Sequence, residues 1–149
     1  MTLRIFNGIQ IDVPDEWSDL STIILAPKKD VKEGNKPSIN LVVKRRPARG
    51  KDLEKTLAQY LAFMKESFGK LEDVEAKPMM VGSIKGKAVR FVTEAAGQRF
   101  RQITLLYQSG GDEISATVTQ LLDDPTPPKQ IEKLLKSIKP AAGGVFGIR

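Results

Sequence analysis

The segment that decides the fold runs from Gly86 to Leu122 and reads GKAVRFVTEA (86–95), AG (96–97), QRFRQITLLYQ (98–108), SGGD (109–112) and EISATVTQLL (113–122). The three long pieces carry the β-branched and apolar residues typical of strands, and the two short pieces contain glycine. Such short connections join antiparallel neighbours, because a parallel neighbour needs a crossover of a dozen or more residues. We therefore predict an antiparallel meander of three strands, Gly86–Ala95, Gln98–Gln108 and Glu113–Leu122.

Further strands are predicted upstream of this meander. Asn7-Gly8 accepts the positive φ of a type I′ turn, so Leu3–Phe6 and Ile9–Val13 should open the chain as a hairpin. We also predict strands at Thr22–Ala26 and Ser38–Lys44, and an irregular strand at Leu71–Val81 that Pro78 interrupts.

Alternation within these strands predicts which residues face the core. In the strand that begins at Ser38, the core side consists of Ile39, Leu41 and Val43, and the opposite side consists of Ser38, Asn40, Val42 and Lys44. In the last strand of the meander, Ile114, Ala116 and Val118 share one face, whereas Ser115, Thr117 and Thr119 share the other. We expect a core on one side of the sheet.

Two amphipathic helices are predicted from apolar residues that recur at helical spacing, one from about Lys51 to Phe68 and one from Lys129 to Ile138. Gly69 ends the first helix and Pro140 stops the second. Pro27–Pro37 lacks apolar periodicity and is predicted to be an exposed loop, and Trp17 is predicted to cap one end of the core. The fold class is therefore α+β, with an antiparallel sheet and flanking helices.

The length of 149 residues predicts one domain, residues 1–140, followed by a flexible tail, residues 141–149. The first residues, Met1–Asn7, lack the long apolar core and the small-residue cleavage site of a secretion signal. No run of eighteen apolar residues predicts a membrane span. The absence of cysteine fits a reducing compartment, so we expect a cytoplasmic protein.

The residue inventory disfavours an enzyme. The chain has no histidine and no cysteine, and therefore lacks the commonest general base and any thiolate nucleophile. Its paired carboxylates, Asp112-Glu113 and Asp123-Asp124, lie at predicted strand ends and do not have the spacing of a calcium loop. We predict no catalytic residues, no metal site and no cofactor.

A net charge of +6 raises the question of nucleic-acid binding, because basic residues gather between Lys44 and Lys51. That segment contains no aromatic residue that could stack on a base, and no recognition helix is predicted. We expect no nucleic-acid partner, and interpret the segment as a solvated basic loop.

The order of the predicted elements and several short motifs resemble the DcrB-like domains, which adopt the PsbP-like α/β/α sandwich. The family pattern Leu-Pro-Asp-x-Trp-x-Asp-x-Ser is similar to the sequence Val13-Pro14-Asp15-Glu16-Trp17-Ser18-Asp19-Leu20-Ser21. Further matches are Asn40-Leu41-Val42-Val43, Leu57-Ala58-Gln59-Tyr60-Leu61 and Arg101-Gln102. The resemblance spans about residues 3 to 138.

Within this family, the chain resembles the Eag chaperones of type VI secretion, which bind the N-terminal transmembrane helices of effectors before export. The resemblance implies a homodimer and a binding face on the sheet that uses apolar and uncharged polar side chains. The corresponding residues here are Thr22, Ile24, Ser38, Asn40, Val42, Met64 and Gln102, and no charge is expected within this set.

Two other interpretations remain open from the sequence. Ser38, Asn40 and Gln102 are also what solvation selects on an open sheet face, and Met64 also fits the apolar stripe of its helix. Alternatively, the protein is a PsbP-like adaptor or assembly protein that docks on a folded partner through Pro27–Pro37 and Lys44–Lys51. Salt would weaken that contact more than a helix in a groove.

Overall fold

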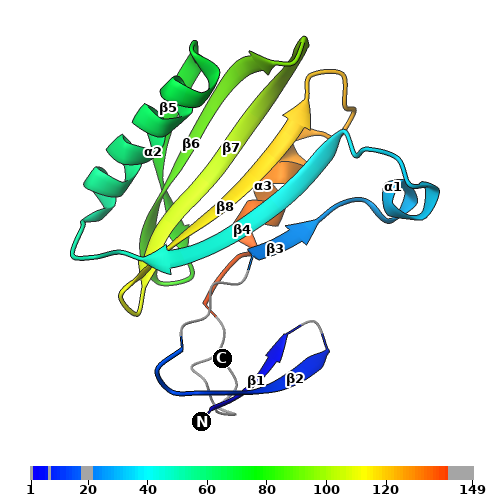
Figure 1. The fold of residues 1–149 in the computed structure, drawn as a ribbon. Coiled ribbons are helices and arrows are strands. Elements are labelled where there is room, and N and C mark those ends of the chain that lie inside the picture. Colours follow the sequence, from blue (N-terminus) through cyan, green and yellow to red (C-terminus); the bar gives the residue numbers. More distant parts are fainter. Residues whose placement is uncertain (1, 7, 18–21, 141–149) are drawn as a thin grey trace.

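The computed structural model describes residues 2–6, 8–17 and 22–140 (Figure 1). In chain order the elements are β1 (Thr2–Phe6), β2 (Ile9–Val13), β3 (Thr22–Leu25), α1 (Lys28–Glu33), β4 (Ile39–Pro47), α2 (Leu53–Phe68), β5 (Glu72–Val81), β6 (Ile84–Ala95), β7 (Gln98–Ser109), β8 (Asp112–Leu121) and α3 (Pro128–Lys136).

The main sheet has six strands in the order β3-β4-β8-β7-β6-β5, and every neighbouring pair is antiparallel. The predicted meander is confirmed as β6, β7 and β8. The predicted strand that contains Pro78 is β5, which lies at an edge of the sheet, where a missing backbone N–H donor is tolerated.

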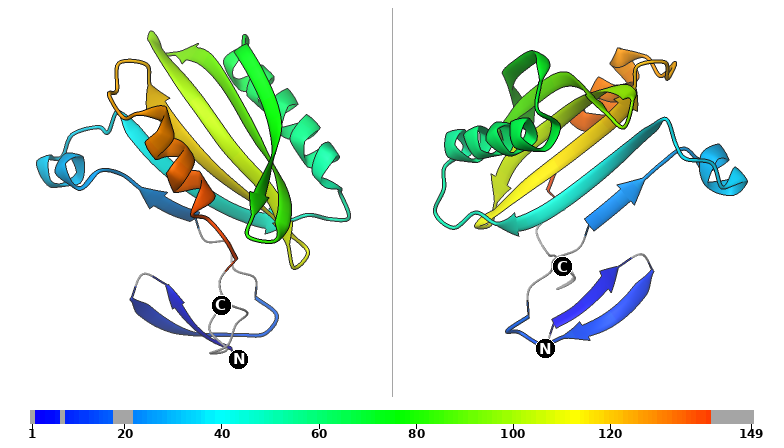
Figure 2. Two further views of the ribbon diagram at one scale, coloured as in Figure 1. Left: turned by 180° about the vertical axis from the view of Figure 1, so that it is seen from behind. Right: turned by 45° about the horizontal axis from the view of Figure 1, so that its top comes forward.

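Helices lie on both faces of this sheet (Figure 2). On one face, Ile131 and Leu135 of α3 pack in a cluster with Leu41, Leu105, Tyr107 and other buried side chains, and this cluster includes the predicted core residues Ile114, Ala116 and Val118. On the other face, Leu57 of α2 packs with Val89 and Leu106. The expectation of a core on one side only is therefore wrong, because the apolar stripe of α2 also needs apolar partners.

Local capping fixes the ends of α2. The side chain of Asp52 accepts a hydrogen bond of 2.8 Å from the backbone N–H of Lys55, which satisfies one of the free donors in the first turn. At the other end, the N–H of Gly69 donates to the carbonyl of Lys65 at 2.7 Å, and Gly69 has a φ of +80°. The predicted helix and its glycine stop are confirmed.

Two predicted loops are partly regular structure. Within Pro27–Pro37 the chain forms α1, and Gly34 ends this helix in a left-handed conformation. A helix of six residues is too short to show an apolar periodicity in the sequence. β4 continues to Pro47 rather than ending at Lys44, because Arg45, Arg46 and Pro47 pair with β8. Half of the predicted basic loop is thus strand.

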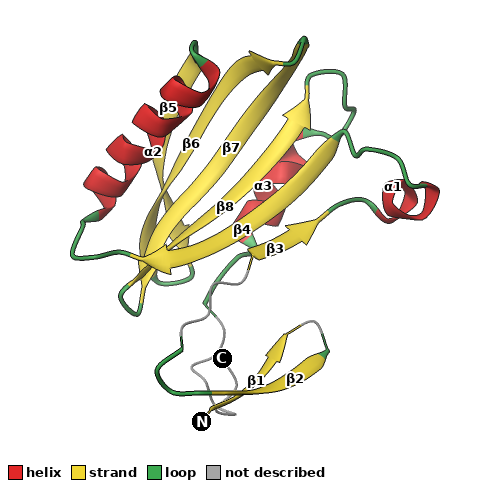
Figure 3. Cartoon of the chain, viewed as in Figure 1, coloured by secondary structure: helices red, strands yellow, loops and turns green. Residues whose placement is uncertain are grey.

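The hairpin β1–β2 forms a two-stranded sheet of its own, apart from the six-stranded sheet (Figure 3). The prediction that Trp17 caps the core is wrong, since 66% of this side chain is exposed where it follows the hairpin. Its backbone N–H closes a turn by donating to the carbonyl of Pro14 at 3.0 Å. The predicted tail, residues 141–149, lies outside the described residues.

Two adjacent leucines of α3 test the packing on this face. Leu135 is 1% exposed and Leu134 is 40% exposed. Leu135→Ala should lower the free energy of unfolding by about 2–5 kcal/mol, because it leaves a cavity in the core. Leu134→Ala should cost less than about 1 kcal/mol. Urea denaturation followed by circular dichroism measures both, and equal losses would contradict this account of the core.

Candidate functional site

A groove lies between α2 and the part of the sheet that α2 leaves open. It has a volume of about 500 Å³. α2 contacts β6 and β7, whereas no helix of the described part of the chain lies over the same face of β8, β4 and β3 (Figure 1). The lining residues come from α2, β4, β7 and β8 and are Val42, Lys44, Arg46, Thr56, Gln59, Tyr60, Phe63, Met64, Gln102, Leu106, Glu113, Ile114, Ser115, Thr117 and Thr119.

Uncharged polar side chains form a connected set along the groove floor. The hydroxyl of Tyr60 bonds that of Thr104 at 2.7 Å, and Thr104 in turn bonds Thr117 at 2.8 Å. These two threonines lie directly opposite each other on β7 and β8, which places both on the same face of the sheet. Burial raises the pKa of the Tyr60 phenol, so this floor stays uncharged at neutral pH.

The uncharged set continues one pair along the same strands. The side-chain amide of Gln102 donates to the hydroxyl of Thr119 at 3.4 Å, and Gln102 also accepts from the Tyr60 hydroxyl at 3.4 Å. Both distances are near the limit for a hydrogen bond, so these groups are less firmly held than the Tyr60–Thr104 pair. The Gln102 amide is therefore the most available polar group of the floor.

The walls of the groove are apolar. Phe63 and Met64 extend from α2, and Val42 faces them from β4. Phe63 is 62% exposed, although it lies beside the helix stripe that packs on the sheet. An exposed phenylalanine beside a partly exposed methionine gives this wall apolar area and, through the flexible thioether, room to adapt.

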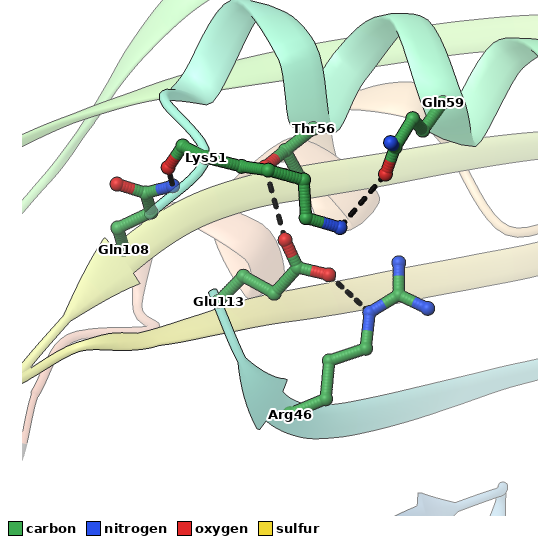
Figure 4. A network of polar contacts seen from close by, with 6 residues as sticks. All are labelled: Arg46, Lys51, Thr56, Gln59, Gln108 and Glu113. Carbon is green, nitrogen blue, oxygen red and sulfur yellow. Dashed lines mark hydrogen bonds and ion pairs between the residues drawn. The ribbon is translucent and has the colours of Figure 1, made fainter. Parts of the chain in front are cut away.

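A network of charged and amide groups closes one end of the groove (Figure 4). Glu113 is buried, and its carboxylate accepts hydrogen bonds from Nε of Arg46 and from the hydroxyl of Thr56, the latter at 2.9 Å. The ammonium of Lys51 donates to Gln59 at 2.8 Å, and Gln108 donates to the carbonyl of Lys51 at 2.6 Å. The network joins β4, β7 and β8 to the start of α2.

The structure brings three of the seven predicted binding residues into the groove, namely Val42, Met64 and Gln102. Thr22 and Ile24 lie on the same face, opposite Lys44 and Val42, on the neighbouring strand β3 beyond the lining. They continue the face to its edge, and Ile24 is 67% exposed.

The remaining two predicted residues are not part of the groove. Asn40 lies opposite Thr119 but lines a second cavity, of about 680 Å³, between β4 and α3, and its side-chain oxygen is buried with no hydrogen-bond partner. Ser38 donates a hydrogen bond to the carboxylate of Asp124. One end of the groove is charged, because Lys44, Arg46 and Glu113 line it. Strand alternation predicts Lys44 on this face, and Arg46 and Glu113 join it because β4 extends to Pro47 and pairs with the start of β8.

Sequence reasoning missed several lining residues. Ser115, Thr117 and Thr119 were placed on the correct face but were not assigned to a site, and their alternating hydroxyls were the available signal. Gln59 and Phe63 flank the apolar stripe of α2, and nothing in the periodicity of the helix distinguishes them from solvated positions.

Two general properties complete the description of the site. Over residues 2–6, 8–17 and 22–140, no three aspartate or glutamate side chains come together in a way that could hold a metal ion. In the same part of the chain, no helix has the length and apolar character needed to cross a membrane.

Together these features define an α+β domain with an open groove that has apolar walls and a floor of hydroxyl and amide groups. Residues 9–139 match the DcrB family, and the chain belongs to that family. A comparison with curated proteins finds no match.

Among solved structures, the fold is similar to the crystal structure of a Pseudomonas aeruginosa protein of unknown function, described as a candidate regulator. The TM-score is 0.75 at 15% sequence identity, over 95% of this chain and 98% of the other. At that identity the likeness concerns the fold alone.

Ser38 can be tested through its partner Asp124. Burial is the largest single influence on this carboxyl and raises its pKa, but hydrogen bonds from Ser38, Thr126 and Gln120 together outweigh burial and lower the pKa of Asp124 to about 2. An aspartate in an unfolded chain has a pKa of about 3.9. The contribution of the Asp124 hydrogen bonds to the free energy of unfolding is therefore complete above that pH and is lost as the pH falls toward 2. Ser38→Ala should raise the Asp124 pKa, as measured by NMR titration of its carboxyl carbon, and an unchanged pKa would show that Ser38 does not hold this loop.

Proposed function

We propose that this protein is a cytoplasmic chaperone that binds and shields the N-terminal transmembrane helices of a type VI secretion effector before export. The observation that carries the proposal is the composition of the groove, where apolar walls formed by Val42, Phe63 and Met64 stand over an uncharged floor that includes Tyr60 and Gln102. The protein acts by binding and catalyses no reaction.

This composition suits a transmembrane helix outside a membrane. Such a helix is about 10 Å wide and needs apolar contact along its length. The open sheet face and the side of α2 that borders it together provide this contact. Polar residues within transmembrane helices bond to small hydroxyl and amide side chains of neighbouring helices. Thr117, Thr119 and Gln102 offer the same groups from the sheet.

Family membership supports the proposal at the level of the fold. The chain is a DcrB protein, and its helices on both faces of an antiparallel sheet fit the PsbP-like sandwich that we propose for it. The motifs around Trp17, Asn40 and Gln102 resemble the DcrB-like domains, and the narrower assignment to the Eag chaperones is part of the proposal.

The basic segment gives little support to the alternative, an adaptor that docks through charge. Arg46 is engaged with buried Glu113, and Arg45 lies 3.7 Å from Asp112 on the opposite face of β4. Each arginine thus already has one carboxylate partner within the chain. Pro27–Pro37 contains α1, a short helix of mostly charged residues of which none is buried. Nothing in this segment indicates a particular partner.

We further propose that the chaperone is a homodimer. Ile23 and Leu25 are 52% and 53% exposed on β3, an edge strand that faces no further strand among the described residues. Ile9 and Ile11 of the hairpin are exposed as well. A second copy would cover these apolar side chains. It would also prevent the edge strand β3 from pairing with strands of unrelated proteins.

A pair of matched valine substitutions tests the groove. Val42→Glu places a carboxylate in the apolar wall, whereas Val74→Glu makes the same change on β5, where Val74 is 44% exposed and does not line the groove. A buried unpaired charge is costly, so Val42→Glu should reduce capture of the helices about tenfold or more and Val74→Glu should leave it unchanged. Co-expression with an effector's N-terminal transmembrane region, followed by affinity purification from the soluble fraction, measures capture.

Circular dichroism of both variants shows whether each is folded. Equal capture by the two folded variants would remove the groove from the proposal. If the wild-type protein leaves the effector segment insoluble while it binds a folded partner in a salt-dependent way, the adaptor alternative is correct.

The dimer is tested by charges on the exposed edge. Ile23→Lys combined with Leu25→Lys should convert the dimer to a monomer, because it brings two lysines from each copy into an apolar contact. Light scattering coupled to size-exclusion chromatography gives the mass directly. Val74→Lys on the other edge strand is the control, and a wild-type protein that elutes as a monomer at all concentrations would disprove the dimer.

A further inference from the structure

The two ends of the groove differ in charge. At one end, β4 contributes Lys44 and Arg46, and β8 contributes Glu113. At the other end, the lining consists of Val42, Met64, Gln102, Thr117 and Thr119, none of which carries a charge. The pairing of β4 with β8 fixes this order, because Arg46 lies opposite Glu113 and Val42 lies opposite Thr117.

The charged end has an excess of positive charge. Glu113 offsets Arg46, to which it is bonded through Nε. Lys44 has no carboxylate partner among the described residues, and Lys51, which belongs to the network at this end, bonds the neutral amide of Gln59 (Figure 4). Asp52, the nearest further acid along the chain, is engaged as the N-cap of α2.

α2 adds to this polarity. Its first residues, near Thr56 and Lys51, lie at the positive end of the groove, and its last residues lie beyond Met64 at the uncharged end. The N-terminal end of a helix carries a partial positive charge, and the C-terminal end carries a partial negative charge. The lysines and the helix dipole therefore favour the same sign of charge at the same place.

Given the proposed function, on which this step rests, we propose that the groove binds its helix in one direction. The helix lies antiparallel to α2, with its C-terminal end and any acidic residues that follow at Lys44 and Arg46. Free carbonyls or carboxylates of the ligand then face the ammonium of Lys44 and the two Nη groups of Arg46, because Glu113 uses only Nε of that arginine. The opposite direction places the positive helix N-terminus and preceding basic residues beside the same lysine, which is a repulsive contact.

The absence of cysteine allows a direct test by cross-linking. Ser115→Cys and Thr119→Cys mark the charged and uncharged ends on one face of β8, about 13 Å apart at the rise of a strand. The probe is a synthetic helix of leucine and alanine with two lysines before it and two aspartates after it, and a cysteine near one terminus or the other. The cysteine at the C-terminal end should form a disulfide with Ser115→Cys in preference to Thr119→Cys, by about tenfold for two charge contacts. The cysteine at the N-terminal end should show the reverse preference.

Charge reversal provides the second arm. Lys44→Glu should abolish or invert the cross-linking preference, whereas Lys65→Glu should leave it intact, because Lys65 is exposed on α2 and does not line the groove. Lys44 makes no ion pair among the described residues, so its reversal leaves no internal carboxylate unpaired.

The outcomes separate the two proposals. Retention of the probe with equal or reversed cross-linking, or with none at either cysteine, overturns the direction of binding and leaves the chaperone proposal standing. Failure of the wild-type protein to retain any probe removes the proposed function, and the direction with it. Retention with the stated preference, lost in Lys44→Glu, supports both.

Discussion

The width of the sheet is the constraint on which the rest of the structure depends. Six strands spaced about 4.8 Å apart span roughly 24 Å, whereas one helix with its side chains is only about 10–12 Å wide. One helix per face therefore leaves about half of that face uncovered. α2 packs on β6 and β7, so β8, β4 and β3 remain open beside it, and the groove exists because none of the other described helices covers that space (Figure 1).

The two faces solve this problem differently. On the face of α3, the strands carry Leu41, Ala116, Val118 and similar residues, which close into the larger core. On the face of α2, the uncovered strands carry Ser115, Thr117 and Thr119 in alternate positions, so that the open part tolerates water. Apolar and hydroxyl side chains alternate along β8, so that one face of this strand contributes to the core and the other face lines the groove.

Much of the fold and part of the site could be predicted from the sequence, because they depend on local patterns. Glycine turns predict the meander, and strand alternation predicts that Val42 lies on the open face. The resemblance to the DcrB-like domains adds Met64 and Gln102, which line the groove. The rest depends on contacts between distant residues. Arg46 and Glu113 are 67 residues apart and Ser38 and Asp124 are 86 apart, so neither pair could be inferred from spacing. The position of Trp17 could not be predicted, because no local sequence pattern shows whether the hairpin that precedes it packs on the six-stranded sheet or stands apart from it.

The hydrogen bonds of the groove floor have a consequence for the kinetics of release. Tyr60, Thr104 and Thr117 already bond one another, so no polar group of this trio waits for a partner. A ligand that bonds to one of these hydroxyls must displace an existing bond, and such an exchange yields little net free energy, since a hydrogen bond contributes only about 0.5–1.5 kcal/mol even when formed anew from water. In the proposed chaperone, apolar contact would then set most of the affinity, the polar floor would select between ligands at small cost in free energy, and dissociation would need no unfolding of the domain.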